Sequence, residues 1–258
     1  MRLQDRVAVV TGGGSGIGAA ICRAMAAEGA AVAVTDSDWQ SAERVAADIR
    51  ESGGRADAWL CDVTVATGVE AVADQIEARL GPISIWVNNA GVSYIVPFLE
   101  CTEETWDTTQ RVNLRGAFIG CQAAVRRMLP RRCGSIINMS SQSGKAGNSH
   151  YAAYCASKFG IIGLTQSIAV EFADHCIRVN ALCPGVVFTP LWDRMIADYA
   201  AKRGMKPHEV KPYLESKIPM RRLGTPEDVA SVAVFLAGDE SAYMTGQALN
   251  INGGSVMG

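Results

Sequence analysis

The stretch Val7-Ala8-Val9-Val10-Thr11-Gly12-Gly13-Gly14-Ser15-Gly16-Ile17-Gly18 decides the fold, because it joins an apolar run to a glycine-rich turn that opens a helical pattern. Such an apolar run is typical of a strand buried on both faces of a parallel sheet. Glycines let the backbone turn tightly and approach a pyrophosphate, whose charge the N-terminus of the next helix stabilises. A glycine-rich turn can also be purely structural, so its surroundings must support the hypothesis. The nucleotide-binding candidates in this turn are Gly12, Ser15, Gly16, Ile17 and Gly18.

Short apolar runs alternate with helical patterns along the whole chain, which indicates βαβ units built around a parallel sheet. We expect strands at residues 7–10, 31–35, 56–61, 83–87, 135–138, 178–182 and 248–251. Helices are expected at residues 17–28, 39–52, 65–80, 103–128, 152–172 and 226–237. The predicted fold class is therefore α/β, with a doubly wound, parallel, seven-stranded sheet flanked by helices, as in the Rossmann fold.

The chain of 258 residues contains no linker, charge block or repeat that would divide it, so a single domain spanning residues 1–258 is expected. One segment interrupts the alternation, because residues 190–222 carry no strand pattern and are rich in Trp, Tyr, Met, Lys and Arg. Long insertions between compact elements are usually functional lids or disordered loops. The aromatic content favours a substrate lid at about residues 190–222.

Composition and charge argue against several classes of function. The formal net charge is −2 and the basic residues are scattered, which disfavours nucleic acid as a partner. The longest apolar stretches, residues 161–164 and 232–237, are too short to cross a membrane. The first strand pattern begins directly after Asp5 and Arg6, which leaves no room for a signal peptide. We therefore expect a cytoplasmic protein without a membrane partner.

The eight cysteines occur singly and form no CxxC motif. Most lie in apolar segments, which predicts buried, reduced thiols rather than a disulfide framework or a zinc site. The three histidines also lack the spacing of metal ligands, so no metal is expected.

An acidic residue, Asp36, ends the second expected strand, 18 residues after Gly18. A carboxylate at this place accepts hydrogen bonds from the hydroxyls of an adenosine ribose and repels the 2′-phosphate of NADP. The alternative is that Asp36 only caps the next helix, although Asp38 can do this alone. No Lys or Arg lies in the glycine turn or beside Asp36, so NAD is predicted as the cofactor.

Tyr154 and Lys158 are four positions apart within an expected helix, so both side chains lie on one face of it. A nearby ammonium favours the phenolate, so we expect Lys158 to lower the pKa of Tyr154 and make it a usable general base. The alternative is an exposed pair of solvated side chains. A serine-rich strand end lies just upstream, at Ser140 and Ser141.

Taken together, these residues resemble the single-domain short-chain dehydrogenase/reductase family, and the resemblance runs nearly end to end. The family's T-G-x-x-x-G-x-G motif is matched by residues 11–18, and its Tyr-x-x-x-Lys motif by Tyr154 and Lys158. The family spacing of 13 residues before the tyrosine selects Ser141 over Ser140 as the catalytic serine. Other family positions are matched by Asp62, Val63, the Asn88-Asn89-Ala90-Gly91 motif, Asn113 and the 184–189 loop.

The resemblance implies a mechanism in which Tyr154 removes the proton of a secondary alcohol while hydride passes to the nicotinamide. Lys158 would hydrogen-bond the nicotinamide ribose, Ser141 the reacting oxygen, and Asn113 a water that relays protons from Lys158 to solvent. Cofactor contacts are also implied for Tyr154, Asp62, Val63, Asn89, Pro184, Val187 and Thr189.

A homotetramer is expected for two reasons. Similar family members are commonly tetramers. The helices at residues 103–128 and 152–172 also carry apolar residues all round, so a monomer would expose apolar surface.

Within the family, several short segments of this sequence resemble those of two groups, the polyol (sorbitol-type) dehydrogenases and the acetoin reductase/meso-2,3-butanediol dehydrogenases. Both share the long insertion and a glutamine after the serine, here Gln142. This implies an NAD-dependent enzyme that interconverts a small polyol, sugar alcohol or vicinal diol with its ketone, with Gln142 bonding a second substrate oxygen. Ser141 and Tyr154 would bond the first oxygen. Trp192 is a further candidate substrate contact, with lid packing alone as an equal alternative.

Two other functions remain open at this point. A 3-oxoacyl-thioester reductase would share these motifs, but such enzymes usually prefer NADP, carry a basic residue near the glycine turn and lack so long an insertion. A non-catalytic dinucleotide-binding regulator would not need the set Asn113, Ser141, Tyr154 and Lys158.

Overall fold

A seven-stranded parallel sheet forms the centre of the computed structural model, which describes residues 1–257. The strand order is β3-β2-β1-β4-β5-β6-β7, and every neighbouring pair is parallel. The predicted fold class is confirmed. The strands are β1 (Val7–Thr11), β2 (Ala31–Asp36), β3 (Arg55–Leu60), β4 (Ile83–Asn88), β5 (Gly134–Met139), β6 (Ile177–Pro184) and β7 (Ala248–Ile251).

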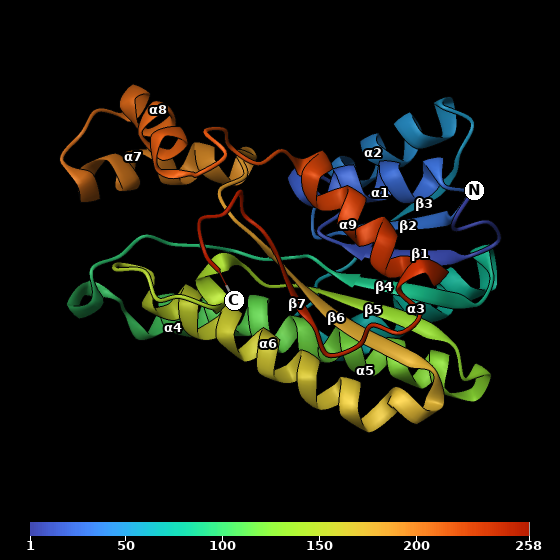
Figure 1. Ribbon diagram of the computed structural model, residues 1–258. Helices are drawn as coiled ribbons and strands as arrows, with labels where there is room; N and C mark the ends of the chain where they lie inside the picture. Colours follow the sequence, from blue (N-terminus) through green and yellow to red (C-terminus); the bar gives the residue numbers. More distant parts are fainter. Residues whose placement is uncertain (258) are drawn as a thin grey trace.

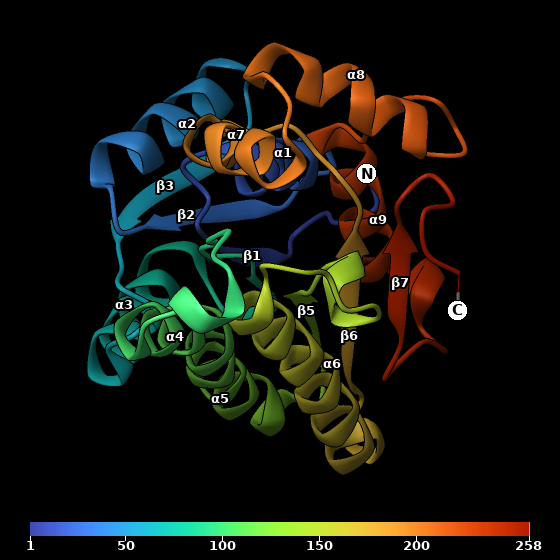
Figure 2. The same cartoon turned by 90° about the vertical axis from the view of Figure 1, so that its left-hand side faces the viewer.

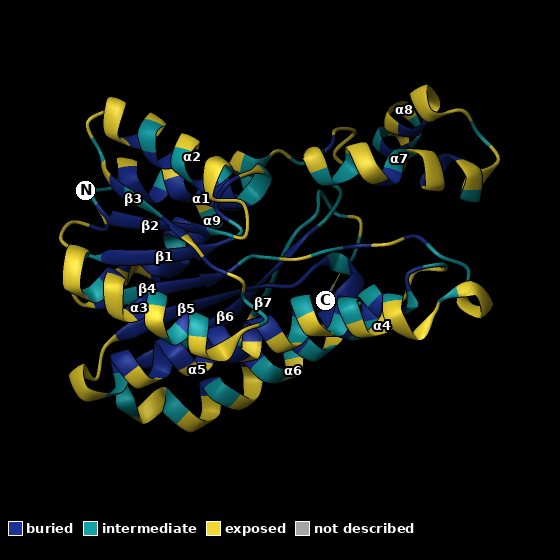
Figure 3. Ribbon diagram, turned by 180° about the vertical axis from the view of Figure 1, so that it is seen from behind, coloured by how far each residue is buried: buried dark blue, intermediate teal, exposed yellow. Residues whose placement is uncertain are grey.

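Helices cover both faces of the sheet, as Figures 1 and 3 show. One face carries α1 (Gly16–Ala27), α2 (Trp39–Glu51) and α9 (Pro226–Ala237), and the other carries α3 (Ala66–Leu80), α4 (Glu103–Thr109), α5 (Gly116–Met128) and α6 (Ala152–Phe172). Each layer has its own apolar core, centred on side chains such as Ile21 and Met25 on the first face and Ile76 and Trp86 on the second. Among residues 1–257, no helix combines the length and the apolarity that a bilayer crossing requires.

The helix expected at residues 103–128 is not a single regular α-helix. A π-helical segment, Gln110–Arg115, separates α4 from α5. π-Helical turns occur mostly as single wide turns and are frequent at functional sites. Asn113 lies in this segment and its side chain is buried.

The segment expected to form a lid contains two helices, α7 (Pro190–Arg203) and α8 (Pro207–Lys217). Each begins with a proline. Proline suits the first helical position because a backbone N–H there would have no partner within the helix. Gly204, with φ +64°, ends α7 in the left-handed conformation. Both helices lie beyond the carboxyl ends of the strands (Figures 1 and 3).

A buried hydrogen-bond network fixes the central strands to the helix below them. Asn88 on β4 donates to Asn138 on β5 over 2.8 Å, and Asn138 donates to Thr165 on α6 over 2.9 Å. Trp86 donates its indole N–H to the Asn88 side-chain oxygen over 2.8 Å. Buried polar groups need such partners, so this network sets the position of α6 relative to β5.

Gly120 on α5 is the residue that lets this network fit, because a Cβ there would lie 2.0 Å from Asn88 Oδ1. We predict that Gly120→Ala lowers the free energy of unfolding by about 2 kcal/mol or more, since the network must move. Urea unfolding measures the change.

Gly68→Ala, in the first turn of α3, is the matched control, because an added Cβ there would meet only ordinary contacts with Val65. This control should be neutral or slightly stabilising. Equal losses of stability in both variants would contradict the prediction.

Candidate active site

The candidate residues gather where β1, β4, β5 and β6 end, at the carboxyl edge of the sheet. Figure 2 looks toward this edge, with α7 and α8 nearest the viewer. The strand order reverses between β1 and β4, and ligands of doubly wound sheets bind at such a reversal. The fold therefore places the sequence-derived candidates at the expected crevice.

The glycine turn has the backbone that its sequence predicts. Gly12 and Gly16 have φ values of +63° and +51°, which side chains rarely tolerate. A Cβ on Gly18 would lie 2.1 Å from the Gly12 carbonyl oxygen, so the first turn of α1 packs directly on the loop. Ser15 is the N-cap residue of α1 but makes no side-chain capping bond to it. The start of α1 is thus a suitable place for a phosphate, with Ile17 in its first turn.

Asp36 and Asp38 have different hydrogen-bond partners, which answers the question of which of them caps the next helix. Asp36 accepts hydrogen bonds from the backbone N–H of Gly14 and of Asp38, each over 3.0 Å. Asp38 is the N-cap of α2 and accepts from Gln40 and Ser41. Capping is therefore done by Asp38, and the partly buried carboxylate of Asp36 borders the glycine turn.

Asn89 supports the glycine turn from β4, because its side-chain amide donates to the carbonyls of Thr11 and Gly12 over 2.9 and 3.0 Å. Thr11, which the sequence reasoning did not single out, accepts from the backbone N–H of Asn89 and Ala90. Threonine at the end of β1 was visible as part of the glycine motif. A direct nucleotide contact for Asn89 stays a prediction.

Asp62 and Val63 follow β3 at the same edge. The Asp62 carboxylate is exposed and accepts from the backbone N–H of Thr64 over 2.8 Å. Val63 packs directly against Gly116: a Cβ atom added to Gly116 would lie 2.9 Å from the Cγ2 atom of Val63. These contacts place both residues beside the start of α5.

The 184–189 loop connects the sheet to the lid. Pro184 ends β6, Val187 forms an isolated parallel bridge with Gly224, and Thr189 is the N-cap of α7. The Thr189 side chain lies against Gly16, 3.1 Å from a Cβ built there. The structure therefore brings this loop onto the glycine turn.

Ser141, Tyr154 and Lys158 are brought together below this loop. The Ser141 hydroxyl, which accepts from the Ser143 backbone N–H over 3.1 Å, lies close enough to the Tyr154 phenol to lower its pKa. The Lys158 Nζ atom donates to the carbonyl of Met139 over 2.7 Å and lies 5.5 Å from the centre of the Tyr154 ring. The Ser140 hydroxyl instead donates to the Lys158 carbonyl over 2.8 Å, which joins the end of β5 to α6.

The electrostatics of this group differ from the sequence-based expectation. Burial raises the pKa of Tyr154 to about 12, and the hydrogen bond from Ser141 lowers it only in part. Burial also lowers the pKa of Lys158 to about 8. Burial therefore outweighs, in this structure, the lowering of the Tyr154 pKa that was expected from Lys158, because the sequence pattern contains no information about desolvation.

Asn113 lies next to Lys158 but is held by the backbone. Its side chain donates to the Val92 carbonyl and to the Ser157 hydroxyl, and it accepts from the Val92 N–H. A Cβ on Gly91 would lie 3.3 Å from Asn113 Oδ1 and 3.7 Å from Lys158 Nζ, which shows how close the two groups come. Ser157, which the sequence reasoning missed, donates its hydroxyl to the Tyr154 carbonyl over 2.7 Å and so links Asn113 to the start of α6.

Gln142 directly follows Ser141, and its side-chain oxygen lacks a hydrogen-bond donor among the described residues. Its Oε1 atom is buried and has no hydrogen-bond partner among residues 1–257. The same atom lies beside Gly185, 3.3 Å from a Cβ built there. A buried acceptor without a donor costs free energy, so this atom requires a donor that the described residues do not supply.

Trp192 is mainly a packing residue of the lid. Its ring stacks on Phe188 with centroids 4.9 Å apart and meets Tyr199 edge-on at 5.6 Å. These rings belong to a third apolar cluster that also contains Tyr151 and reaches Tyr154. Trp192 thus packs against Phe188 and within the 190–222 segment, and both a substrate contact and a lid role for it stay predictions.

Lys202 on α7 joins the lid to the loop before α6, a contact that no sequence motif indicated. Its Nζ atom donates to Asn148 Oδ1 over 3.0 Å and to the Ser149 carbonyl over 2.5 Å, and lies 4.8 Å from the centre of the Tyr151 ring. Burial lowers the pKa of Lys202. The lid is therefore fastened close to the start of the helix that carries Tyr154.

Comparison with known proteins agrees with this geometry. Residues 12–255 match the family model described as Enoyl-(Acyl carrier protein) reductase. The chain is 40% identical to a D-threitol dehydrogenase of Mycolicibacterium smegmatis, covering 98% of this chain and 94% of the relative. It is also 40% identical to a galactitol 2-dehydrogenase of Agrobacterium fabrum, with both chains covered fully. The chain belongs to the short-chain dehydrogenase/reductase family.

Two further similarities show the breadth of this short-chain dehydrogenase/reductase family. A 3-oxoacyl-(acyl-carrier-protein) reductase of Thermotoga maritima is 37% identical, with both chains covered fully. A crystal structure of a short-chain type dehydrogenase/reductase from Mycobacterium marinum superposes with a TM-score of 0.90 at 36% identity, covering 99% of this chain and 97% of the other. Membership shows an oxidoreductase that acts on CH–OH groups with a dinucleotide cofactor.

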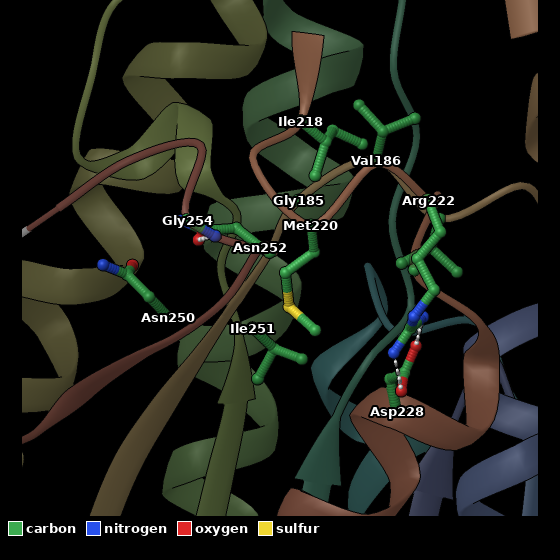
Figure 4. Close-up of a pocket in the computed structure, with 13 residues that line it drawn as sticks. Gly185, Val186, Ile218, Met220, Arg222, Asp228, Asn250, Ile251, Asn252 and Gly254 are labelled. Atoms are coloured by element: carbon green, nitrogen blue, oxygen red, sulfur yellow. Dashed lines mark hydrogen bonds and ion pairs between the residues drawn. The ribbon is translucent and has the colours of Figure 1, made fainter. Parts of the chain in front are cut away.

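A separate cavity of about 330 Å³ lies behind the 184–189 loop of this family member. It is lined by residues 185–187 of that loop, by Ile218, Met220, Arg222 and Gly224, and by residues 250–254, and Figure 4 shows Arg222 paired with Asp228 at its edge. Neither Ser141 nor Tyr154 lines it. We therefore do not assign the reacting groups to this cavity.

Lys158 should leave a signature in the pH dependence of stability. Its pKa is about 8 when folded against an ordinary value of 10.5, so the unfolded chain binds more protons between these two pH values and wild-type stability gains with rising pH there. Lys158→Met removes this gain. The stability of the variant relative to wild type should therefore fall by on the order of 2 kcal/mol across that range.

Urea unfolding at several pH values measures the difference, and Lys211→Met, which removes an exposed lysine, is the control. A difference between Lys158→Met and wild type that does not change with pH would contradict the assigned desolvation.

Proposed function

We propose that the protein interconverts a small polyol, sugar alcohol or vicinal diol with its ketone, using NAD. The observation that carries the substrate class is the buried, unpartnered Oε1 atom of Gln142 next to Ser141. A substrate with a second hydroxyl beside the reacting one would supply the missing donor. The names of the threitol and galactitol relatives support the same class.

The proposed dinucleotide site runs from the glycine turn to the 184–189 loop. The positive φ values of Gly12 and Gly16 and the uncapped start of α1 fit a pyrophosphate. When bound, the dinucleotide would supply the hydride acceptor and a positively charged ring. The residues proposed to hold it are Gly12, Ser15, Gly16, Ile17, Gly18, Asp36, Asp62, Val63, Asn89, Tyr154, Lys158, Pro184, Val187 and Thr189.

Tyr154 is proposed to accept the proton of the substrate hydroxyl, and Ser141 to hydrogen-bond the same oxygen as it gains negative charge. The raised pKa of Tyr154 means that the free enzyme keeps the phenol protonated. A phenol is then ready to donate a proton during ketone reduction. For alcohol oxidation, positive charge must be added nearby to favour the phenolate, and Lys158 is proposed to contribute part of it.

Lys158 and Asn113 are proposed to connect this proton to solvent. Lys158 has its pKa lowered to about 8 by burial, so it can exchange a proton near neutral pH more readily than an exposed lysine. Asn113 lies beside it with a side chain fixed by Val92 and Ser157. A proton passed between Tyr154 and Lys158 would leave the site along this side.

The lid formed by α7 and α8 is proposed to close the substrate pocket. Its aromatic residues pack in the cluster that reaches Tyr154, and Lys202 fastens α7 to residues 148–149. Trp192 would then exclude water from the reacting groups and contact the substrate. A closed, dry pocket also strengthens the hydrogen bond that Gln142 would form.

A 3-oxoacyl-thioester reductase is the second candidate, because the Thermotoga maritima relative is nearly as similar. An acyl chain offers no donor to Gln142 Oε1, and this makes the candidate less favoured. The two functions differ in cofactor use as well as in substrate.

We also propose that the protein is a cytoplasmic homotetramer. Exposed apolar side chains on the helices of one layer, namely Trp106, Phe118, Phe159 and Val170, support burial against another copy. Reduced cysteines without disulfides suit a reducing compartment.

Replacement of Gln142 tests the substrate class. We predict that Gln142→Leu lowers kcat/KM for 2,3-butanediol at least about tenfold, because one hydrogen bond of roughly 1.4 kcal/mol is lost. The same variant should leave kcat/KM for 2-butanol nearly unchanged, since that alcohol has no second hydroxyl. NADH absorbance gives both rates, and equal losses on the two alcohols, or no turnover of any diol or polyol by the wild type, would reject the proposal.

Replacement of Asp36 tests the choice of cofactor. We predict that the wild type prefers NAD and that Asp36→Asn shifts the ratio of kcat/KM for NAD and NADP toward NADP by about tenfold or more, because a charge repulsion is removed. Asp38→Asn, which changes the capping residue of α2 only, is the control. A wild type that prefers NADP would favour the thioester reductase instead.

A further inference from the structure

Two of the eight cysteines do not follow the expectation of buried thiols. Cys133 and Cys176 are both exposed, while Cys22, Cys61, Cys121, Cys155 and Cys183 are buried and Cys101 is intermediate. The expectation is therefore wrong for this pair. The two residues stand 43 positions apart in the sequence, so no local motif connects them.

The sheet register brings these two cysteines to neighbouring positions. Gly134 at the start of β5 pairs with Ile177 at the start of β6. Cys133 and Cys176 each precede their strand by one residue, so they stand side by side at the amino edge of the sheet. Neighbouring strands are about 4.8 Å apart, which lies within the range of about 4.4–6.8 Å between the Cα atoms of a disulfide.

The residues that follow these cysteines are held on one face of the sheet. Ser135 and Arg178 are register partners, and both donate to the Leu236 carbonyl of α9 over 2.8 Å. Cys133 and Cys176 stand two positions before this pair, each in the loop that leads into its strand. The electrostatic influence of Cys133 on Arg178 independently places this thiol against β6.

The two loops that carry the cysteines are held together by Arg132. Its guanidinium donates to the Asp174 carbonyl and lies 3.1 Å from Nδ1 of His175. Both loops have the same form, a short 3₁₀ helix followed by a left-handed residue, Arg132 in one and Cys176 in the other. The pair is thus fixed in position while both thiols stay open to solvent.

We infer that Cys133 and Cys176 form a redox-active pair, which a small disulfide such as oxidised glutathione converts to a disulfide bond between the starts of β5 and β6. One thiolate attacks a sulfur of oxidised glutathione, forming a mixed disulfide and releasing one glutathione thiolate. The second cysteine then attacks the protein sulfur of that mixed disulfide and releases the second glutathione. Two thiols are oxidised by two electrons, glutathione disulfide is reduced to two glutathiones, and the two protons pass to the released thiolates.

The consequence is greater stability rather than direct control of the reacting groups. β5 and β6 carry the Ser141 turn and the 184–189 loop at their opposite, carboxyl ends. A cross-link at the amino edge leaves those loops in place and restricts the unfolded chain. We expect the oxidised enzyme to keep its turnover and to unfold at a temperature several degrees higher.

Peptide mapping of the intact enzyme tests this directly. The protein is treated with oxidised glutathione, remaining thiols are blocked with N-ethylmaleimide, and trypsin digestion follows without reduction. Cleavage after Arg132, Lys145, Lys158 and Arg178 gives fragments 133–145 and 159–178, each with one cysteine of the pair and no other. The expected result is a linked peptide of these two fragments, removed by reductant, with the rise in Tm measured on the same sample.

Variants separate the pair from the other thiols. Cys133→Ser and Cys176→Ser should each abolish both the linked peptide and the rise in Tm, whereas Cys101→Ser, at another accessible thiol, should keep both. The inference is overturned if the wild type yields fragments 133–145 and 159–178 blocked separately or carrying glutathione. It is equally overturned if the link joins two chains, seen as a dimer on a non-reducing gel.

Discussion

The hydrogen bond from the Lys158 ammonium to the Met139 carbonyl is the contact on which the candidate site depends. It joins α6 to the end of β5 and holds a buried positive charge beneath the Tyr154 ring. The deeper Asn88–Asn138–Thr165 network joins the same two elements and adjacent β4. Since α6 also carries Tyr154 and the end of β5 leads to Ser141, these contacts decide how the proposed catalytic groups face one another.

Much of the fold and of the candidate site was predictable from local sequence. The strand before the glycine turn, the helix after it and Asp36 at the end of β2 follow from short-range patterns that do not depend on the rest of the chain. The choice of Ser141 over Ser140 rested on its distance to Tyr154, and the structure gives the two hydroxyls different partners, Tyr154 for one and the Lys158 carbonyl for the other. The sequence also indicated that Asp38 can cap α2, and the structure shows that it does, so Asp36 is not needed for capping.

The properties that sequence reasoning missed all depend on contacts between distant segments. The raised pKa of Tyr154 results from burial, which involves the lid cluster as well as α6. The π-helical segment around Asn113 and the Lys202 contact have no signature in a residue pattern. The Cys133–Cys176 pair appears only when the register between β5 and β6 is known. Local spacing identified the candidate residues, and desolvation and register decided their state.

The central claim is that the free enzyme holds Tyr154 as a neutral phenol and that cofactor binding promotes its ionisation. Tyrosinate absorbance of wild type minus Tyr154→Phe, titrated with and without saturating NAD, measures this directly. The account predicts no ionisation of Tyr154 up to about pH 10, the ordinary phenol range, without NAD, and ionisation at clearly lower pH with it. A tyrosinate at neutral pH in the free enzyme, or identical titrations in both states, would contradict the account.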